Sequence, residues 1–152
     1  MRHHLASIVI AQFLLLGGLS CPSRADDSPD TRAPTERTET ERIFVLTQMR
    51  SFLTAVAEIE EGLGSGDLDQ VARVAAARGR KATTTLVRPP TLAAKESDAW
   101  KAMIASMRTG FDQIADEATA RAPAMQINKA LAETMHNCIA CHQTYRITVD
   151  GR

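Results

Sequence analysis

The sequence predicts an all-α protein folded as an antiparallel four-helix bundle, and three observations lead to this prediction. Apolar residues recur three and four positions apart in separate segments between residues 41 and 149, which is the spacing of one helix face. Gly or Pro residues separate these segments. No segment shows sustained period-two alternation or an Asn-Gly turn, so strands are not expected. Amphipathic helices bury their apolar faces most simply against one another, which favours the bundle.

The composition narrows the classes of function. The chain has 152 residues with 18 Lys and Arg against 18 Asp and Glu, so no nucleic-acid partner and no polybasic membrane-binding surface are expected. Aromatic residues make up only 4%, which leaves aliphatic side chains and Met to fill the core. The sequence contains no Gly-x-Ser-x-Gly motif and no Gly-rich loop with the Lys that phosphate binding needs. We therefore do not expect an enzyme.

Residues 1–25 have the pattern of a secretory signal peptide. A short basic start precedes an apolar run from Leu5 to Leu16, which is shorter than the about 20 residues of a membrane-spanning helix. Small residues follow, and we expect cleavage after Ala25, which implies export to the periplasm. The alternative is a lipoprotein signal in which Cys21 is lipidated, but Leu19 lies one position away from the usual pattern.

The segment 26–40 differs in composition from the rest of the chain. It carries many charges, two prolines and no aliphatic side chain larger than Ala. Such a segment buries too little apolar surface to offset its ordering entropy, so we expect a mobile leader. The folded domain is then expected over residues 41–149.

An apolar stripe and a group of glycines predict the first two helices. From Glu41 onward the stripe residues are Val45, Met49, Phe52, Val56, Ile59 and Leu63. Gly62, Gly64 and Gly66 are expected to end this helix. Asp67 is expected to cap a short second helix that ends before Gly79.

A long connection and two more helices are predicted beyond Gly79. Residues 80–92 contain Pro89-Pro90, which favours a connection without regular structure. A third helix is expected from near Ser97, with Gly110 as a local weakness, and Pro123 suits the first turn of a fourth helix. The apolar stripe of the fourth helix is Ile127, Leu131, Met135, Cys138, His142 and Tyr145.

The fourth helix carries the sequence Cys138-Ile139-Ala140-Cys141-His142, a C-x-x-C-H motif. Positions i, i+3 and i+4 share one face of a helix, so both thiols and the imidazole point the same way. Two thiols at this spacing can form thioethers with the two vinyl groups of a haem, and the adjacent His is then the axial ligand of the iron. The motif therefore predicts one covalently bound haem c, which agrees with export.

Three other interpretations of the cysteine pair remain. A thioredoxin-like dithiol would lie at the N-terminus of a helix after a strand, whereas this pair is near the end of the last helix. A zinc site needs four ligands, and the chain after residue 25 offers only the two Cys with His136 and His142. An ordinary disulfide fits the spacing but leaves His142 unexplained.

The C-terminal segment, with C-x-x-C-H followed by Tyr145 and Arg146, resembles the haem-binding end of the cytochrome c′ family, the class II c-type cytochromes. The resemblance extends over residues 41–149 in helix order and length, and it implies a cytochrome c′-like bundle. It implies that Cys138 and Cys141 hold the haem and that His142 is the proximal ligand. It also places Arg146 one turn later, beside that ligand, although a solvent-facing cation at the helix end is an equal alternative.

The ligand at the sixth position of the iron is the least determined feature. In the resembling family the first helix covers the opposite face of the haem, with an apolar residue or with a ligating Met. Met49 lies on the stripe of the first helix and is the candidate ligand, because a thioether binds iron and raises its reduction potential. Filling of the core is the alternative role of Met49, with Leu46, Phe52 and Leu53 as the residues that would then cover the haem. Met103 and Met107 are weaker candidates, and His136 is expected to point away from the iron.

The predicted function is electron transfer by a periplasmic mono-haem cytochrome with redox partner proteins. The alternative is a five-coordinate haem module that binds nitric oxide or carbon monoxide as a small gas ligand. A third interpretation is that haem only stabilises a small interaction protein. The resemblance also implies a homodimer formed through the first two helices.

Overall fold

The computed structural model describes residues 29–82 and 87–149. The predicted signal peptide, its alternative lipidation site Cys21 and the first residues of the leader lie outside these ranges. Residues 1–30 and 31–152 form two separate units, and the fold described here is that of the second unit. No helix within the described ranges combines the length and apolar character that crossing a membrane requires.

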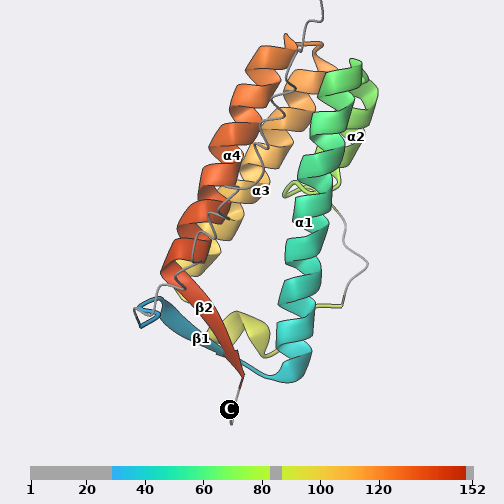
Figure 1. Cartoon of the computed structure of the whole chain (residues 1–152). Helices are drawn as coiled ribbons and strands as arrows, with labels where there is room; N and C mark the ends of the chain where they lie inside the picture. Colours follow the sequence, from blue (N-terminus) through green and yellow to red (C-terminus); the bar gives the residue numbers. More distant parts are fainter. Residues whose placement is uncertain (1–28, 83–86, 150–152) are drawn as a thin grey trace, which may run out of the picture. The chain divides into compact units, whose positions relative to one another are not determined.

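The described chain is mostly helical, which confirms the predicted all-α class, and it also contains a small two-stranded sheet (Figure 1). Successive helices pack on one another along the chain, the first on the second, the second on the third and the third on the fourth. The α-helices are α1 (Glu39–Ser65), α2 (Leu68–Ala76), α3 (Asp98–Thr119) and α4 (Ala124–Thr144), and a 3-10 helix, η1 (Leu92–Lys95), precedes α3.

Helix α1 begins two residues before the expected start and continues past two of the glycines that were expected to end it. Its start is fixed by a capping box, in which the Thr38 side chain accepts a hydrogen bond from the Glu41 N–H and Glu41 accepts one from the Thr38 N–H. Its end is Gly66, whose φ of 76° is the left-handed conformation that favours glycine. Gly62 and Gly64 remain helical, and the helix ends only at Gly66, where the backbone becomes left-handed.

The starts of the other helices agree with the sequence prediction. The Asp67 carboxylate accepts a hydrogen bond from the Gln70 N–H at 2.9 Å and caps α2. The Ser97 hydroxyl accepts one from the Trp100 N–H at 3.1 Å and caps α3. Pro123 was expected in the first turn of the fourth helix and is instead the N-cap residue directly before α4. One residue type at each of these positions was thus enough to predict approximately where the helix begins.

The main hydrophobic core joins all four helices. Phe52 of α1 stacks on Phe111 of α3 with ring centroids 5.6 Å apart. Gly110 explains the close approach of α3 to α4, because a Cβ at this position would overlap the Thr134 side chain. The glycine that the sequence suggested as a weak point of the helix is therefore required for packing.

The sheet is the main difference from the predicted fold. Strand β1 (Ala33–Arg37) pairs in parallel with β2 (Tyr145–Val149), and Ala33 lies opposite Tyr145 while Arg37 lies opposite Val149. Figure 1 shows both strands at the end of the structure where α1 begins and α4 ends. The expectation of a mobile leader is therefore wrong for residues 33–37, where backbone hydrogen bonding replaces the missing apolar burial.

The fourth helix is also shorter than predicted. Its apolar stripe was expected to extend to Tyr145, but Tyr145 is extended, with φ −122° and ψ 147°, and begins β2. The Tyr145 ring instead makes an edge contact with Trp100, with centroids 5.2 Å apart. This contact belongs to a second core cluster at the sheet end, which also contains Val45, Leu92 and Cys141.

Candidate functional site

The two cysteines of the C-x-x-C-H motif lie in the last two turns of α4 and are both free thiols. Cys141 is buried and Cys138 is half-buried. With His142 they line one cavity of about 390 Å³, as the i, i+3, i+4 spacing predicts. A cavity of this size lies in the range of small-molecule and cofactor sites.

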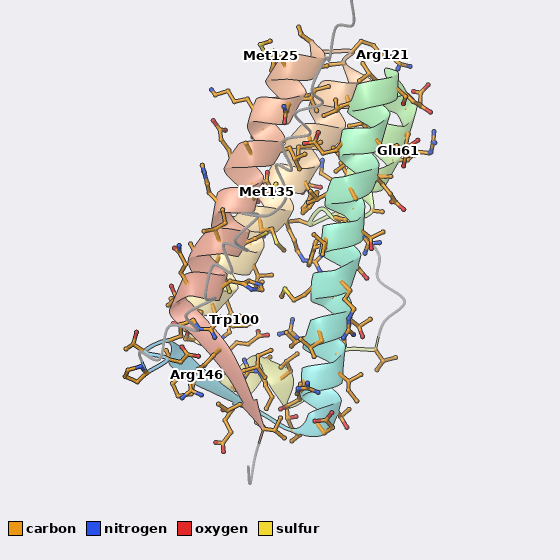
Figure 2. The ribbon with its side chains drawn as sticks, in the orientation of Figure 1. Glu61, Trp100, Arg121, Met125, Met135 and Arg146 are labelled. Atoms are coloured by element: carbon orange, nitrogen blue, oxygen red, sulfur yellow. The ribbon has the colours of Figure 1, made fainter. Side chains whose placement is uncertain are left out.

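The walls of this cavity come from α1, α3 and α4 and are largely apolar. Figure 2 marks Met135 on the α4 wall. Helices α1 and α3 contribute the side chains of Met49, Phe52, Leu53, Val56, Met103, Ile104, Met107 and Phe111. Side chains of this kind exclude water, and the α4 wall adds the two thiols, the imidazole and the polar side chains of Thr134 and Asn137.

Several lining residues are apolar yet exposed. Leu53 is 70% exposed and Ile139 is 48% exposed, and they come from α1 and α4 respectively. Exposed large apolar side chains that gather around one cavity are typical of a binding site for an apolar partner or ligand. The lining therefore favours an apolar group over a hydrated ion.

Met49 lies on the α1 wall of the cavity and is partly buried. Of the rival covering residues, Phe52 and Leu53 line the cavity, and Leu46 is not among its lining residues. Met103 and Met107 of α3 line it as well, and the Met107 Sδ lies 3.7 Å from the Cys138 Sγ. The structure thus brings the thiols, His142 and three candidate methionines to one cavity.

Burial raises the pKa of the Cys138 thiol. Burial also raises the pKa of Cys141, and the neighbouring Cys138 adds to this effect. A redox-active dithiol needs the opposite shift, which a helix N-terminus supplies, whereas both cysteines lie near the C-terminus of α4. The environment of the pair therefore argues against a thioredoxin-like dithiol.

A zinc site made of side chains would need further ligands close to the cysteines. Over residues 29–82 and 87–149, no group of three or more His, Cys, Asp or Glu side chains is arranged to hold a metal ion. His136 is exposed and is not among the residues that line the cavity. These observations concern a purely side-chain metal site and do not bear on haem.

Arg146 differs from its predicted placement. It was expected one helical turn after His142, but α4 ends at Thr144 and Arg146 belongs to β2. Its Nε donates a hydrogen bond to the Arg32 carbonyl oxygen at 3.3 Å, and it is not among the lining residues of the cavity. The predicted position on the helix is therefore wrong, because the chain becomes extended at Tyr145.

Three polar lining residues were not singled out from the sequence. Arg50, Thr134 and Asn137 line the cavity. The only sequence signal for Arg50 and Asn137 is position, because Arg50 follows Met49 and Asn137 precedes Cys138. Residues beside a predicted ligand on the same helix are reasonable candidates for the edge of its site.

No protein-family model, no curated protein and no solved structure gives a significant match to this chain.

Proposed function

We propose that this protein is an exported mono-haem c-type cytochrome that transfers electrons to and from partner proteins. One observation carries the proposal: Cys138, Cys141, His142 and Met49 all line the same apolar cavity, although Met49 lies on a different helix. Haem has an apolar face, two vinyl groups and an iron that exchanges one electron, so these four residues and this lining match its needs.

Each motif residue has a defined role in this proposal. Cys138 and Cys141 hold the haem through thioether bonds, and the His142 imidazole is the proximal ligand. Burial raises the pKa of both thiols and so favours their neutral form. The covalent links then fix the group at the C-terminal end of α4.

Helices α1 and α3 set the properties of the opposite wall. Their apolar side chains exclude water, and a low local dielectric together with a thioether ligand from Met49 raises the reduction potential. A haem iron exchanges one electron without a change in the bonds of a substrate, so we propose electron transfer rather than catalysis. We therefore do not propose an enzyme.

We infer the finer architecture from the resemblance of the C-terminal segment to the cytochrome c′ family. The helices are proposed to form an antiparallel four-helix bundle of the cytochrome c′ kind, with the small sheet as an addition at one end. The packing of α1 on α2, α2 on α3 and α3 on α4 supports this proposal. The periplasm is the proposed location, and it rests on the signal-like segment 1–25.

The direct test is haem retention in cysteine variants made in a host that matures c-type cytochromes. The protein is expected to keep its colour on acid-acetone extraction, and the double variant Cys138→Ser/Cys141→Ser is expected to lose it. Cys21→Ser is the matched control, because it removes the third cysteine from the segment that we propose to be a signal peptide. Equal haem retention in the double variant and the control would refute covalent attachment.

A five-coordinate haem that binds nitric oxide or carbon monoxide is a second candidate. It is favoured by Phe52, Leu53 and Val56, which place apolar side chains on the same wall as Met49. If one of these residues covers the haem, the sixth position stays open for a small gas. Carbon monoxide binding by the reduced protein separates the two candidates.

A further inference from the structure

Arg50 is the only permanently charged side chain among the described residues that line the apolar cavity. It lies on α1 directly after Met49, whereas the two thiols of the C-x-x-C-H motif lie on α4. Arg50 is exposed, in contrast to the buried Phe52 on the same helix. A charge at the exposed margin of a cavity stays hydrated in the free protein and can meet a charged group of a ligand there.

The guanidinium of Arg50 makes no hydrogen bond or ion pair with another described residue. Two neighbouring arginines differ in this respect. Arg42, on the same helix, pairs with Glu39 at 3.0 Å. Arg108 of α3 donates a hydrogen bond to the Gly79 carbonyl oxygen at 3.2 Å. Arg50 therefore lines the cavity with donors that the rest of the described chain does not use.

Haem has two carboxylates that the site must accommodate. These propionates lie on the half of the macrocycle opposite the two vinyl groups. Attachment of the vinyl groups to Cys138 and Cys141 places that half at α4, so the propionates extend away from the two cysteines. A carboxylate beside apolar walls is costly unless a cation or hydrogen-bond donors receive it.

The other polar lining residues all lie on α4, the wall that holds the cysteines. They are Thr134, Asn137 and His142, and the Thr134 hydroxyl already donates a hydrogen bond to the Ala130 carbonyl oxygen at 2.8 Å. The lining residues from α3 are all apolar. Among the described lining residues outside α4, Arg50 alone can neutralise a carboxylate, and its planar guanidinium can bind both carboxylate oxygens at once.

We propose that Arg50 holds one haem propionate, so that the macrocycle is anchored at both halves, by the cysteines of α4 and by the guanidinium of α1. This proposal rests on the proposed cytochrome function and adds a residue outside the C-x-x-C-H motif. An uncompensated negative charge near the iron favours the ferric state, so the Arg50 cation also raises the reduction potential.

The first test is resonance Raman spectroscopy of the haem-loaded protein. The bending vibrations of the haem propionates respond to hydrogen bonding at the carboxylate. Arg50→Leu removes the charge and all donors, so one propionate band is expected to shift. Arg50→Lys keeps the charge without the planar donor pair, and a smaller shift is expected. An anion from solution bound at Arg50 would leave the propionate bands unchanged between variants, so the readout identifies the source of the carboxylate.

The second test is the reduction potential of the same variants, measured by spectroelectrochemistry. Arg50→Leu is expected to lower the potential, and Arg50→Lys is expected to restore most of it because the charge is kept. Arg42→Leu is the matched control, because Arg42 is an arginine of α1 that is not among the lining residues and pairs with Glu39. A purely structural role of Arg50 would change stability but not the propionate bands.

The proposal is overturned if haem is attached and Arg50→Leu has the propionate bands and the potential of the unmodified protein, a result that leaves the cytochrome function intact. Absence of haem from the unmodified protein would refute the cytochrome function and this proposal together. If neither Arg50 variant retains haem, NMR of the reduced, carbon monoxide-treated unmodified protein decides. A nuclear Overhauser effect between Arg50 and propionate protons is then expected, and its absence would overturn the proposal.

Discussion

The Sγ of Cys138 lies 3.7 Å from the Sδ of Met107, so α3 contacts α4 directly at the first cysteine of the motif. Met107 is buried in the main core and also lines the apolar cavity. One side chain thus connects the packing of the helices to the proposed site of haem attachment. Substitutions at Met107 are therefore expected to change the free energy of unfolding according to the volume of the new side chain.

Met107→Ala is expected to lower the free energy of unfolding by about 2–5 kcal/mol, because it removes a buried side chain and enlarges a cavity. Met107→Leu conserves the volume and is expected to cost less than about 1.5 kcal/mol. Urea unfolding followed by circular dichroism measures both values. Equal losses for the two variants would show that size is not what Met107 contributes.

Met49 is proposed as the sixth ligand of the iron, and its replacement should open that position. The reduced protein is expected to have a low-spin absorption spectrum that carbon monoxide does not change, and Met49→Leu is expected to bind the gas. Met103→Leu is the matched control, because Met103 lines the same cavity from α3. Binding of carbon monoxide by the unmodified protein would instead favour the five-coordinate function.

Glu41 is expected to make stability depend on acid pH. Burial alone would raise the pKa of this carboxyl, but hydrogen bonds from Lys95, Thr91 and the Thr38 N–H outweigh it and lower the pKa from 4.5 to about 2. A lowered folded-state pKa gives stability that is present above pH 4.5 and is lost as the pH falls toward about 2.

This loss is expected to reach up to about 3 kcal/mol. Melting temperatures between pH 6 and pH 2 measure it, and Glu41→Gln should flatten that part of the profile. Glu39→Gln serves as the control, because Glu39 is exposed and pairs only with its helix neighbour Arg42 among the described residues. A profile that Glu41→Gln leaves unchanged would assign the acid sensitivity to other groups.

Two glycines in helices should respond in opposite ways to the same substitution. A Cβ at Gly110 would overlap the Thr134 side chain, so Gly110→Ala is expected to cost about 1–3 kcal/mol of stability. Gly64 has open space around the Cβ position, so Gly64→Ala is expected to stabilise α1 by up to about 1 kcal/mol. Thermal melts of the two variants check the signs, and stabilisation by Gly110→Ala would contradict the close packing of α3 on α4.

The helices could be predicted because their signals are local. The stripe from Val45 to Leu63 follows the period of α1, and Asp67 and Ser97 cap α2 and α3 as their residue types indicate. The grouping of Cys138, Cys141 and His142 followed from the motif spacing, because positions i, i+3 and i+4 lie on one helix face. These features depend on residues fewer than five positions apart.

The sheet could not be predicted because its signals are not local. The β1 sequence, Ala-Pro-Thr-Glu-Arg, has no alternating apolar residues, and its partner β2 lies at the other end of the chain. Tyr145 continues the spacing of the α4 stripe, so the sequence pattern indicates a helix where the backbone is extended. The burial of Arg37 follows from this pairing and had no signal in a segment rich in charges.

Intact mass spectrometry of the protein from a host that matures c-type cytochromes tests the central claim most directly. The account predicts one species with the mass of the polypeptide from residue 26 onward plus one haem, and this species should survive denaturation. A mass equal to the polypeptide alone, in a colourless protein, would contradict covalent haem attachment and with it the proposed function.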